Sequence, residues 1–198
     1  MYKVFVENRP VIFTQNSETD SLSLCLEADE VEDVNLVVRN RIELISHNKP
    51  LVIHCADAGI EFNRLFLRHD RVSAAGGVVR RWDDILFIRK NDMWDLPKGF
   101  VDFGETIAET AYREISEECG IEGHVLTRKL IETWHTYTYH DRPVLKQTHW
   151  FEFQYSGTKR TIPQVEEGIS DAVWISKNQF NTVLNECYGS VRDVLEYF

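Results

Sequence analysis

Three glutamates stand at helical spacing in the run REISEECG, residues 113–120. Glu114, Glu117 and Glu118 occupy relative positions i, i+3 and i+4, where side chains on a helix are neighbours and like charges destabilise it by about 0.2–0.5 kcal/mol per pair. They also precede Gly120, a natural residue for ending a helix, so the negative end of the helix dipole lies beside them. The arrangement therefore favours a bound cation, and hard carboxylate oxygens favour Mg²⁺ or Mn²⁺.

The segment that carries these glutamates has clear helix signals of its own. Thr106 and Glu109 fit a capping box, in which each side chain accepts a hydrogen bond from the other residue's backbone amide. With Gly120 as the stop, this spacing predicts a helix over residues 107–119. The helix would present its carboxylates from a defined and rigid position.

A helical wheel places the carboxylates away from the solvent side of this helix. Glu118 lies about 20° from Ile107, inside the apolar arc, and Glu114 lies at the edge of that arc. Glu117 lies farther round but on the same side. A solvated charge run would lie opposite the apolar face, so we expect at least Glu118 to be partly buried. Buried carboxylates at the negative end of a helix are normally neutralised or paired, and a divalent cation would do this.

The elements around this helix indicate a mixed α/β domain over residues 73–198. AAGGVVR and DILFIRK read as paired strands around a turn at residues 82–84, and the loop NDMWDLPKGFVDFGE leads into the helix. Two long alternating strands follow, at about 130–139 and 144–155, and then a short strand, AVWIS. The C-terminal region is expected to be helical in two pieces that break near Gly189.

Residues 1–72 have a different texture and read as a small β-β-α-β-α unit. Two short strands are expected within residues 2–14, a helix over about 31–46, a buried strand at 51–55 and a second helix around Phe62. Neither repeats nor a low-complexity linker separate the two parts. The predicted domain boundary therefore falls near residue 72, to within a few residues.

Composition excludes several classes of function. The formal net charge of −10 argues against broad binding to nucleic acid or to an acidic membrane, which needs a basic face. The four cysteines are widely spaced and are expected to be reduced thiols in a cytoplasmic protein rather than disulfides or zinc ligands. No apolar run approaches about 18 residues, so no signal peptide or membrane span is expected.

The run from Gly99 to Ile121 resembles the Nudix box, G-x5-E-x7-R-E-U-x-E-E-x-G-U, where U is apolar. Every specified position of the pattern is present, so chance is a negligible explanation. The matching residues are Gly99, Glu105, Arg113, Glu114, Ile115, Glu117, Glu118, Gly120 and Ile121. The resemblance implies a Nudix α/β/α sandwich over residues 73–198, while residues 1–72 lie outside it and resemble no family that we recognise.

What the resemblance implies for the site is a metal-dependent hydrolase acting on a pyrophosphate. Glu114, Glu117 and Glu118 are the implied ligands of Mg²⁺ or Mn²⁺, with the backbone carbonyl of Gly99 as a further ligand. An ion pair between Glu105 and Arg113 is implied to brace the loop against the helix.

The general base is not the same residue throughout the family. Glu117 or Glu118 can serve, and so can a glutamate on a later loop. Here Glu166 and Glu167 stand just before the last strand, so Glu117, Glu118 and Glu167 are the catalytic candidates and the choice among them stays open. An ordinary exposed acidic loop is an equally good reading of this pair.

Four further residues are candidates for substrate contact. The run WDLPKG is similar to the W-x-x-P-K-G run of dinucleoside polyphosphate hydrolases and of decapping-type Nudix proteins, so Lys98 could contact a phosphate and Trp94 could stack on a base. A solvated lysine and a structural tryptophan are the alternatives. Tyr137 and Lys146, on the two long strands, could line the pocket or simply pack.

The resemblance favours a Nudix pyrophosphohydrolase that takes a phosphorylated small molecule, with a dinucleoside polyphosphate as the first candidate substrate. Nucleoside diphosphate sugars and inositol pyrophosphates remain open. The rival class is a nucleotide sensor that binds without hydrolysis, but such proteins commonly carry a degraded box and those acting on DNA carry a DNA-binding domain. Residues 1–72 show no helix-turn-helix and could form a homodimer contact, a lid or a specificity module.

Overall fold

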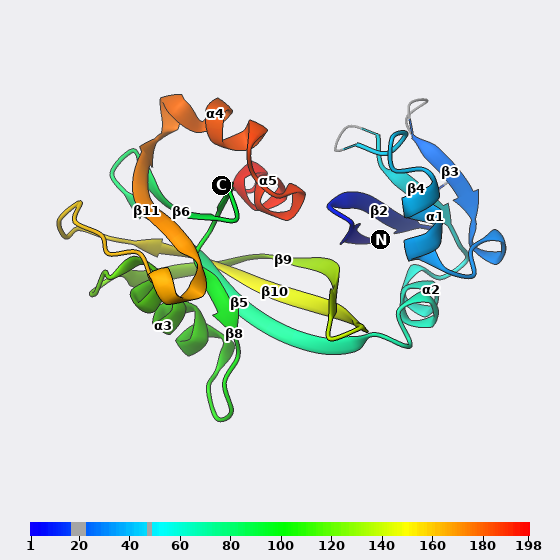
Figure 1. The fold of residues 1–198 in the computed structure, drawn as a ribbon, viewed down its shortest axis with the longest axis horizontal. Helices are drawn as coiled ribbons and strands as arrows, with labels where there is room; N and C mark the ends of the chain where they lie inside the picture. Colours follow the sequence, from blue (N-terminus) through cyan, green and yellow to red (C-terminus); the bar gives the residue numbers. More distant parts are fainter. Residues whose placement is uncertain (17–22, 47–48) are drawn as a thin grey trace. The chain divides into compact units, whose positions relative to one another are not determined.

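The computed structural model describes residues 1–16, 23–46 and 49–198. The chain forms two compact units (Figure 1). The first unit comprises Met1–Val72 together with Trp134–Lys146, and the second comprises Ser73–Thr133 together with Gln147–Phe198. The first unit therefore includes a segment from the middle of the two long strands, which the sequence patterns had placed with residues 73–198. A domain boundary at residue 72 stays a prediction.

The strands of the first unit follow the order β9-β1-β2-β4-β3. Their bounds are β1 (Tyr2–Val6), β2 (Arg9–Thr14), β3 (Leu24–Glu27), β4 (Leu51–His54) and β9 (Val125–Tyr139), of which β9 belongs only in part to this unit. β1 and β2 form a hairpin whose turn residues, Glu7 and Asn8, both have positive φ, as a two-residue turn between twisted strands requires. β4 pairs in parallel with β2 on one side and with β3 on the other, and β1 pairs in parallel with β9 at Trp134 and His135.

Two short helices of the first unit differ from their predicted bounds. The helix expected over 31–46 is α1 (Val34–Asn40), which begins at the N-cap Asp33. Val31 and Ile45 are buried, as their spacing suggested, but they lie outside the helix because burial does not require helical backbone. The second helix is α2 (Ala58–Leu65), capped by Asp57. The sequence patterns also missed β3 and the short 3-10 helix η1 (Ala28–Glu30).

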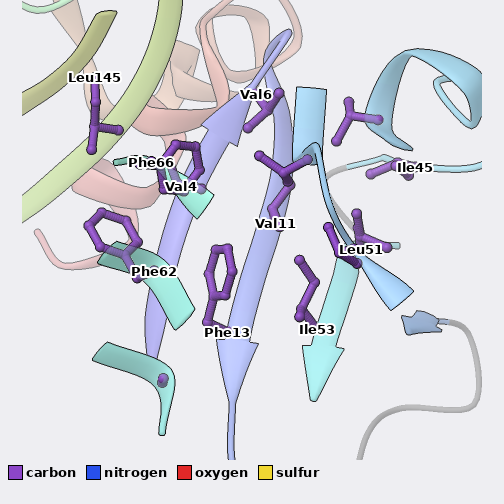
Figure 2. Packing of buried hydrophobic residues seen from close by; sticks show 14 residues of the cluster. Val4, Val6, Val11, Phe13, Ile45, Leu51, Ile53, Phe62, Phe66 and Leu145 are labelled. Atoms are coloured by element: carbon purple, nitrogen blue, oxygen red, sulfur yellow. The ribbon is translucent and has the colours of Figure 1, made fainter. Parts of the chain in front are cut away.

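A hydrophobic core holds the first unit together (Figure 2). Aromatic rings meet at its centre, where Phe62 lies edge-on to Phe13 and packs beside Phe66 and Trp134. The strands contribute Val4, Val6, Val11, Phe13, Leu51 and Ile53, and the helices contribute Val34, Val38, Ala58 and Phe62. Both helices therefore pack on the same face of the sheet.

The second unit is built on strands in the order β11-β6-β5-β10-β9. Their bounds are β5 (Asp70–Arg81), β6 (Asp84–Lys90), β10 (Arg142–Gln154) and β11 (Ile169–Ser176), with the two short strands β7 (Met93–Asp95) and β8 (Lys98–Phe100) pairing with β6 and β5. The sheet is mixed, and the two predicted hairpin turns are present at Trp82 and at His140–Asp141, where φ is positive. The longer strands predicted for this part are thus confirmed, although β9 begins earlier than expected. The segment predicted to be a loop before the helix contains the two short strands β7 and β8, which the sequence patterns missed.

Helices cover both faces of this sheet, as the resemblance implied (Figure 1). The helix α3 (Ile107–Cys119) packs Ala111 and Ile115 against Phe151 and Phe153. On the other face, α4 (Phe180–Asn185) and α5 (Gly189–Glu196) pack with Trp150. The 3-10 helices η2 (Val165–Glu167) and η3 (Lys177–Gln179) flank β11. The mixed α/β sandwich is therefore confirmed.

Other expectations from composition concern the thiols and the membrane. Cys55, Cys119 and Cys187 are free thiols, and Cys119 and Cys187 are buried. Among the residues that the structure describes, none of the helices has the length and apolar character needed to traverse a bilayer.

We expect the free energy of unfolding to depend on pH because a histidine is buried against α3. The His124 ring stacks on Tyr112, its Nε2 lies 3.2 Å from the Tyr112 carbonyl oxygen, and its Nδ1 is buried without a partner. Burial lowers the pKa of His124 from its ordinary 6.5, although the Tyr112 carbonyl and Glu122 oppose the shift. As the pH falls, the unfolded chain therefore binds a proton at this histidine before the folded protein does. The contribution of His124 to the free energy of unfolding is complete above pH 6.5 and is lost as the pH falls through 6.5 and below.

We expect the variant His124→Gln, which can still donate to the Tyr112 carbonyl, to lose less unfolding free energy than wild type between pH 7.5 and pH 5.5. Urea denaturation at the two pH values measures this difference. Other groups titrate equally in both proteins, so only the difference between them reports on His124. An identical loss in wild type and variant would contradict the prediction.

Candidate active site

The helix α3 begins and ends where its sequence predicted. The Thr106 hydroxyl accepts from the Glu109 amide at 3.3 Å, and the Glu109 carboxylate accepts from the Thr106 amide at 2.8 Å. At the other end, Gly120 adopts a left-handed conformation with φ 64°, and its amide donates to the Ser116 carbonyl. Capping at both ends fixes the register in which the glutamates project.

The three glutamates of α3 differ in burial in the order that the helical wheel indicated. Glu118 is 1% exposed and Glu114 is 6% exposed. The Glu117 side chain is 48% exposed. Two ionisable carboxyl groups therefore lie inside the protein at the C-terminal half of a helix, where both burial and the helix dipole disfavour negative charge.

Glu118 has one oxygen satisfied and one left without a partner. The backbone amide of Lys98 donates to Oε2 at 2.7 Å. Oε1 is buried and has no hydrogen-bond partner. Burial raises the pKa of Glu118 to about 7, although Lys98 acts in the opposite direction. A buried carboxylate oxygen without a donor is costly unless something positive binds it.

Glu114 packs directly on the backbone of Gly99. A Cβ at residue 99 would lie closer than 3.0 Å to all three atoms of the Glu114 carboxyl group. Only glycine therefore allows this approach. Burial raises the pKa of Glu114, while the Arg113 guanidinium, which donates to Oε1 at 2.7 Å, acts in the opposite direction.

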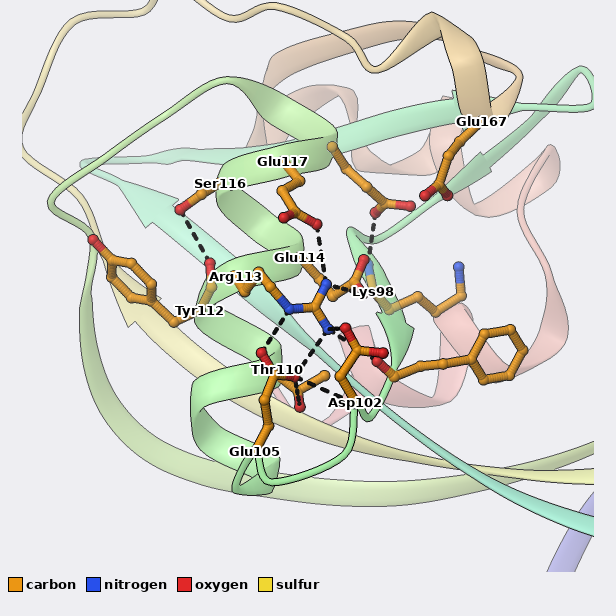
Figure 3. A network of polar contacts seen from close by, with 12 residues as sticks. Lys98, Asp102, Glu105, Thr110, Tyr112, Arg113, Glu114, Ser116, Glu117 and Glu167 are labelled. Carbon is orange, nitrogen blue, oxygen red and sulfur yellow. Dashed lines mark hydrogen bonds and ion pairs between the residues drawn. The ribbon is translucent and has the colours of Figure 1, made fainter.

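Arg113 binds several acceptors at once (Figure 3). It pairs with Glu105 through two bonds, Nε to Oε1 at 2.7 Å and Nη2 to Oε2 at 2.9 Å, and Nη2 also donates to the Phe100 carbonyl. Hydrogen bonds from Arg113 and Thr110 lower the pKa of Glu105 to about 2. The predicted ion pair is thus present, and it ties the loop after β8 to α3.

The donor set suits a hard divalent cation. Five carboxylates, those of Asp95, Glu105, Glu114, Glu117 and Glu118, are bonded to two cationic side chains, Arg113 and Lys98, or to the Lys98 backbone. Within the described ranges no three His, Cys, Asp or Glu side chains converge as a formed metal site. Arg113 Nη1 donates to both Glu114 and Glu117. The buried free oxygen of Glu118 and the excess of carboxylates nevertheless fit Mg²⁺ or Mn²⁺.

Two of the candidate substrate residues are engaged in other contacts. The Lys98 ammonium group lies 2.6 Å from Asp95 Oδ2, and both side chains are nearly buried. Although burial by itself lowers the pKa of Lys98, Asp95 and Glu118 outweigh it and the pKa is raised. Trp94 is half-buried beneath the Arg89 guanidinium, and its amide donates to the Glu186 carbonyl. The contacts of Trp94 favour its structural alternative. Lys98, which is nearly buried and ion-paired, fits neither a solvated lysine nor a phosphate contact while it binds Asp95.

Glu167 lies on η2, beside the carboxylates of α3 (Figure 3). Its side chain is half-exposed and lies 3.4 Å from Lys90 Nζ. Its charge is one of those that raise the pKa of Glu114, so the two carboxylates are near one another. Tyr137 and Lys146, by contrast, belong to the first unit. Asp95 was missed altogether, and its only signal in the sequence was its place three residues before Lys98.

Together the sandwich and the acidic helix define a class: an α/β protein whose carboxylates gather at one loop–helix junction. The sequence model of the NUDIX domain matches residues 70–195, which is more than half of the chain, and the chain therefore belongs to the Nudix family.

Comparison with individual proteins supports the fold. The chain is 33% identical over 84 residues to MutT4 of Mycobacterium tuberculosis (strain CDC 1551 / Oshkosh), which is named as a mutator protein; the match covers 42% of this chain and 32% of that protein. It thus spans about a third of that relative's length.

Among solved structures, the dihydroneopterin triphosphate pyrophosphohydrolase of E. coli is 18% identical, with a TM-score of 0.52, and the alignment covers 66% of this chain and 96% of that one. A bifunctional NMN adenylyltransferase/ADP ribose pyrophosphatase of Francisella tularensis, complexed with AMP and a Mn ion, is 24% identical with a TM-score of 0.47, over 69% of this chain and 44% of that one.

Proposed function

We propose that this protein hydrolyses a phosphoanhydride bond in a nucleoside diphosphate linked to another group, with a divalent cation held by α3. The observation that carries the proposal is the state of Glu118: a buried carboxylate with one oxygen bonded to the Lys98 amide and the other without a partner. Such a group destabilises the protein unless it binds a cation. The family membership of residues 70–195 supports the same activity.

Different residues of the chain would have different roles in this reaction. Glu114 and Glu118, with the Gly99 carbonyl and Glu117, would hold the cation. A bound Mg²⁺ or Mn²⁺ supplies charge neutralisation at the pyrophosphate and a lower pKa for water. Arg113 keeps the loop against the helix through Glu105.

Water attacks phosphorus, and the anhydride P–O bond breaks. The bridging oxygen leaves with the departing phosphate, and the proton of the attacking water passes to a carboxylate. Glu167 is our candidate for this base, because it is half-exposed to water and lies near Glu114. Glu117 is the alternative, since its side chain is equally accessible.

A dinucleoside polyphosphate is the first candidate substrate, on the WDLPKG run alone. Lys98 is engaged with Asp95, so it contributes to that preference only if substrate displaces the pair. Nucleoside diphosphate sugars and inositol pyrophosphates are the alternatives.

The test is a hydrolysis panel of dinucleoside polyphosphates, nucleoside diphosphate sugars, nucleoside triphosphates and inositol pyrophosphates with the full chain. We expect turnover of one class in Mg²⁺ or Mn²⁺, complete loss on chelation with EDTA, and recovery when metal is restored in excess. Turnover that persists in EDTA would contradict the metal site. Tight binding of one compound without turnover would instead support a nucleotide sensor.

A further inference from the structure

The side chain of Asp95 is buried at the turn between β7 and β8. It ends β7 and is 4% exposed. Its Oδ1 accepts from the Leu96 amide at 2.8 Å, and its Oδ2 accepts from the Lys98 ammonium group at 2.6 Å. Both partners lie within three residues of Asp95, so its side chain closes the turn that joins β7 to β8.

That same turn donates a hydrogen bond to the carboxylate of Glu118. The Lys98 amide donates to Glu118 Oε2 at 2.7 Å, across 20 residues of sequence. Lys98 thus connects Asp95 with Glu118. Its side chain binds Asp95, and its backbone amide binds Glu118. The bond at Oε2 sets the direction in which the free Oε1 points.

The remaining residues of this turn are in contact with β5. The Gly77 amide donates to the Pro97 carbonyl at 3.1 Å. A Cβ at Gly76 would lie closer than 3.0 Å to the Pro97 oxygen and to Lys98 Cβ and Cα. Asp95 itself pairs with Ile88 across β6 and β7. Lys98 begins β8 and pairs with Gly76 of β5, and the Asp95 side chain adds the contact with its ammonium group.

We propose that Asp95 is a positioning residue of the metal site, which acts through Lys98 to hold Glu118 with one oxygen free for the cation. Its ionised carboxylate is suited to this task because it binds the Lys98 ammonium group and the Leu96 amide at once. The proposal rests on the proposed function only in naming the cation as the ligand of Glu118. Residues that orient metal ligands in this way typically change metal affinity by about 10- to 100-fold when they are replaced.

The test compares Asp95→Asn with Glu152→Gln in the full chain. Glu152 is a matched control because it is equally buried and ion-paired, and its ion-pair partners, Arg80 and Arg128, are not residues of the site. Two quantities are measured besides turnover: hydrogen exchange of the Lys98 amide without metal, and the dissociation constant of Mn²⁺ alone by electron paramagnetic resonance.

We expect Asp95→Asn to lose protection at the Lys98 amide and to weaken Mn²⁺ binding by about 10-fold or more, while Glu152→Gln loses stability but keeps both quantities. Unchanged protection at Lys98 in Asp95→Asn would overturn the proposal, as would Mn²⁺ binding equal to that of wild type. Failure of wild type to bind Mn²⁺ would contradict the proposed function, and the exchange experiment would still decide whether Asp95 positions the Lys98 amide.

Discussion

Replacing Glu118 by glutamine is expected to lower kcat by about 10²- to 10⁴-fold, because Glu118 is a proposed metal ligand and a metal ion stabilises transition-state charge by several kcal/mol. Glutamine keeps the size of the side chain and can still accept from the Lys98 amide, so the fold and the turn are retained. What is lost is the negative charge on the buried free oxygen. Steady-state kinetics in Mg²⁺, on whichever substrate the panel identifies, measures the effect.

The same substitution is expected to stabilise the metal-free protein above neutral pH. Burial raises the pKa of Glu118 to about 7, so the folded state binds a proton that the unfolded state has released. The resulting destabilisation is absent below pH 4.5, grows through the window from 4.5 to about 7, and is complete above it. We expect Glu118→Gln to be more stable by on the order of 1–3 kcal/mol at pH 8 in EDTA.

Urea denaturation in EDTA at pH 5 and pH 8 measures this gain. The control is Glu122→Gln, which removes an exposed carboxylate just beyond the same helix. If a buried carboxylate binds the metal, its replacement should lower the activity and raise the stability of the metal-free protein in the same variant. A Glu118→Gln protein with wild-type turnover, or with lower stability at pH 8 in EDTA, would contradict the assignment.

Replacing Gly99 by alanine is the second substitution with a large expected effect. The added methyl group would overlap the Glu114 carboxyl group, which packs against the Gly99 backbone. Either Glu114 or the loop must move, and a displacement of about 1 Å at a reacting site costs about 10²-fold in rate. We therefore expect a loss of turnover of this size together with weaker binding of Mn²⁺.

Gly59→Ala is the matched control, because the nearest atom outside its own helix backbone would be 3.3 Å from the new methyl group. A further variant separates overlap from other causes: Gly99→Ala combined with Glu114→Asp shortens the opposing side chain. We expect Gly99→Ala to lower the melting temperature and the double variant to regain it but not the turnover, since Glu114 is a proposed metal ligand. Turnover in Gly99→Ala equal to that in Gly59→Ala would contradict the prediction.

Local sequence determined the helix at the centre of the site. The bounds of α3, its capping box and its end at Gly120 all follow from contacts between residues three or four apart, which a pattern reports directly. The same periodicity identified Glu118 as an interior residue. Periodicity predicts a wrong helix end where a buried residue does not have helical backbone. Ile45 is buried, as its spacing suggested, but α1 ends at Asn40.

The motif also predicted which chemistry is available, since hard carboxylate oxygens are the ligands that Mg²⁺ prefers. It did not determine which of their atoms are satisfied. Lys98, read from the sequence as a candidate phosphate ligand, pairs with Asp95, and its amide binds Glu118.

Only the tertiary structure decided these pairings, as it decided that Glu114 packs on Gly99 and that Tyr137 and Lys146 belong to the first unit. The physical reason is distance along the chain. A helix is stabilised by neighbours within one turn, whereas the partner of a buried polar group is set by how separate strands and loops pack. Glu118 and Lys98 are 20 residues apart, and no local pattern records that their atoms meet.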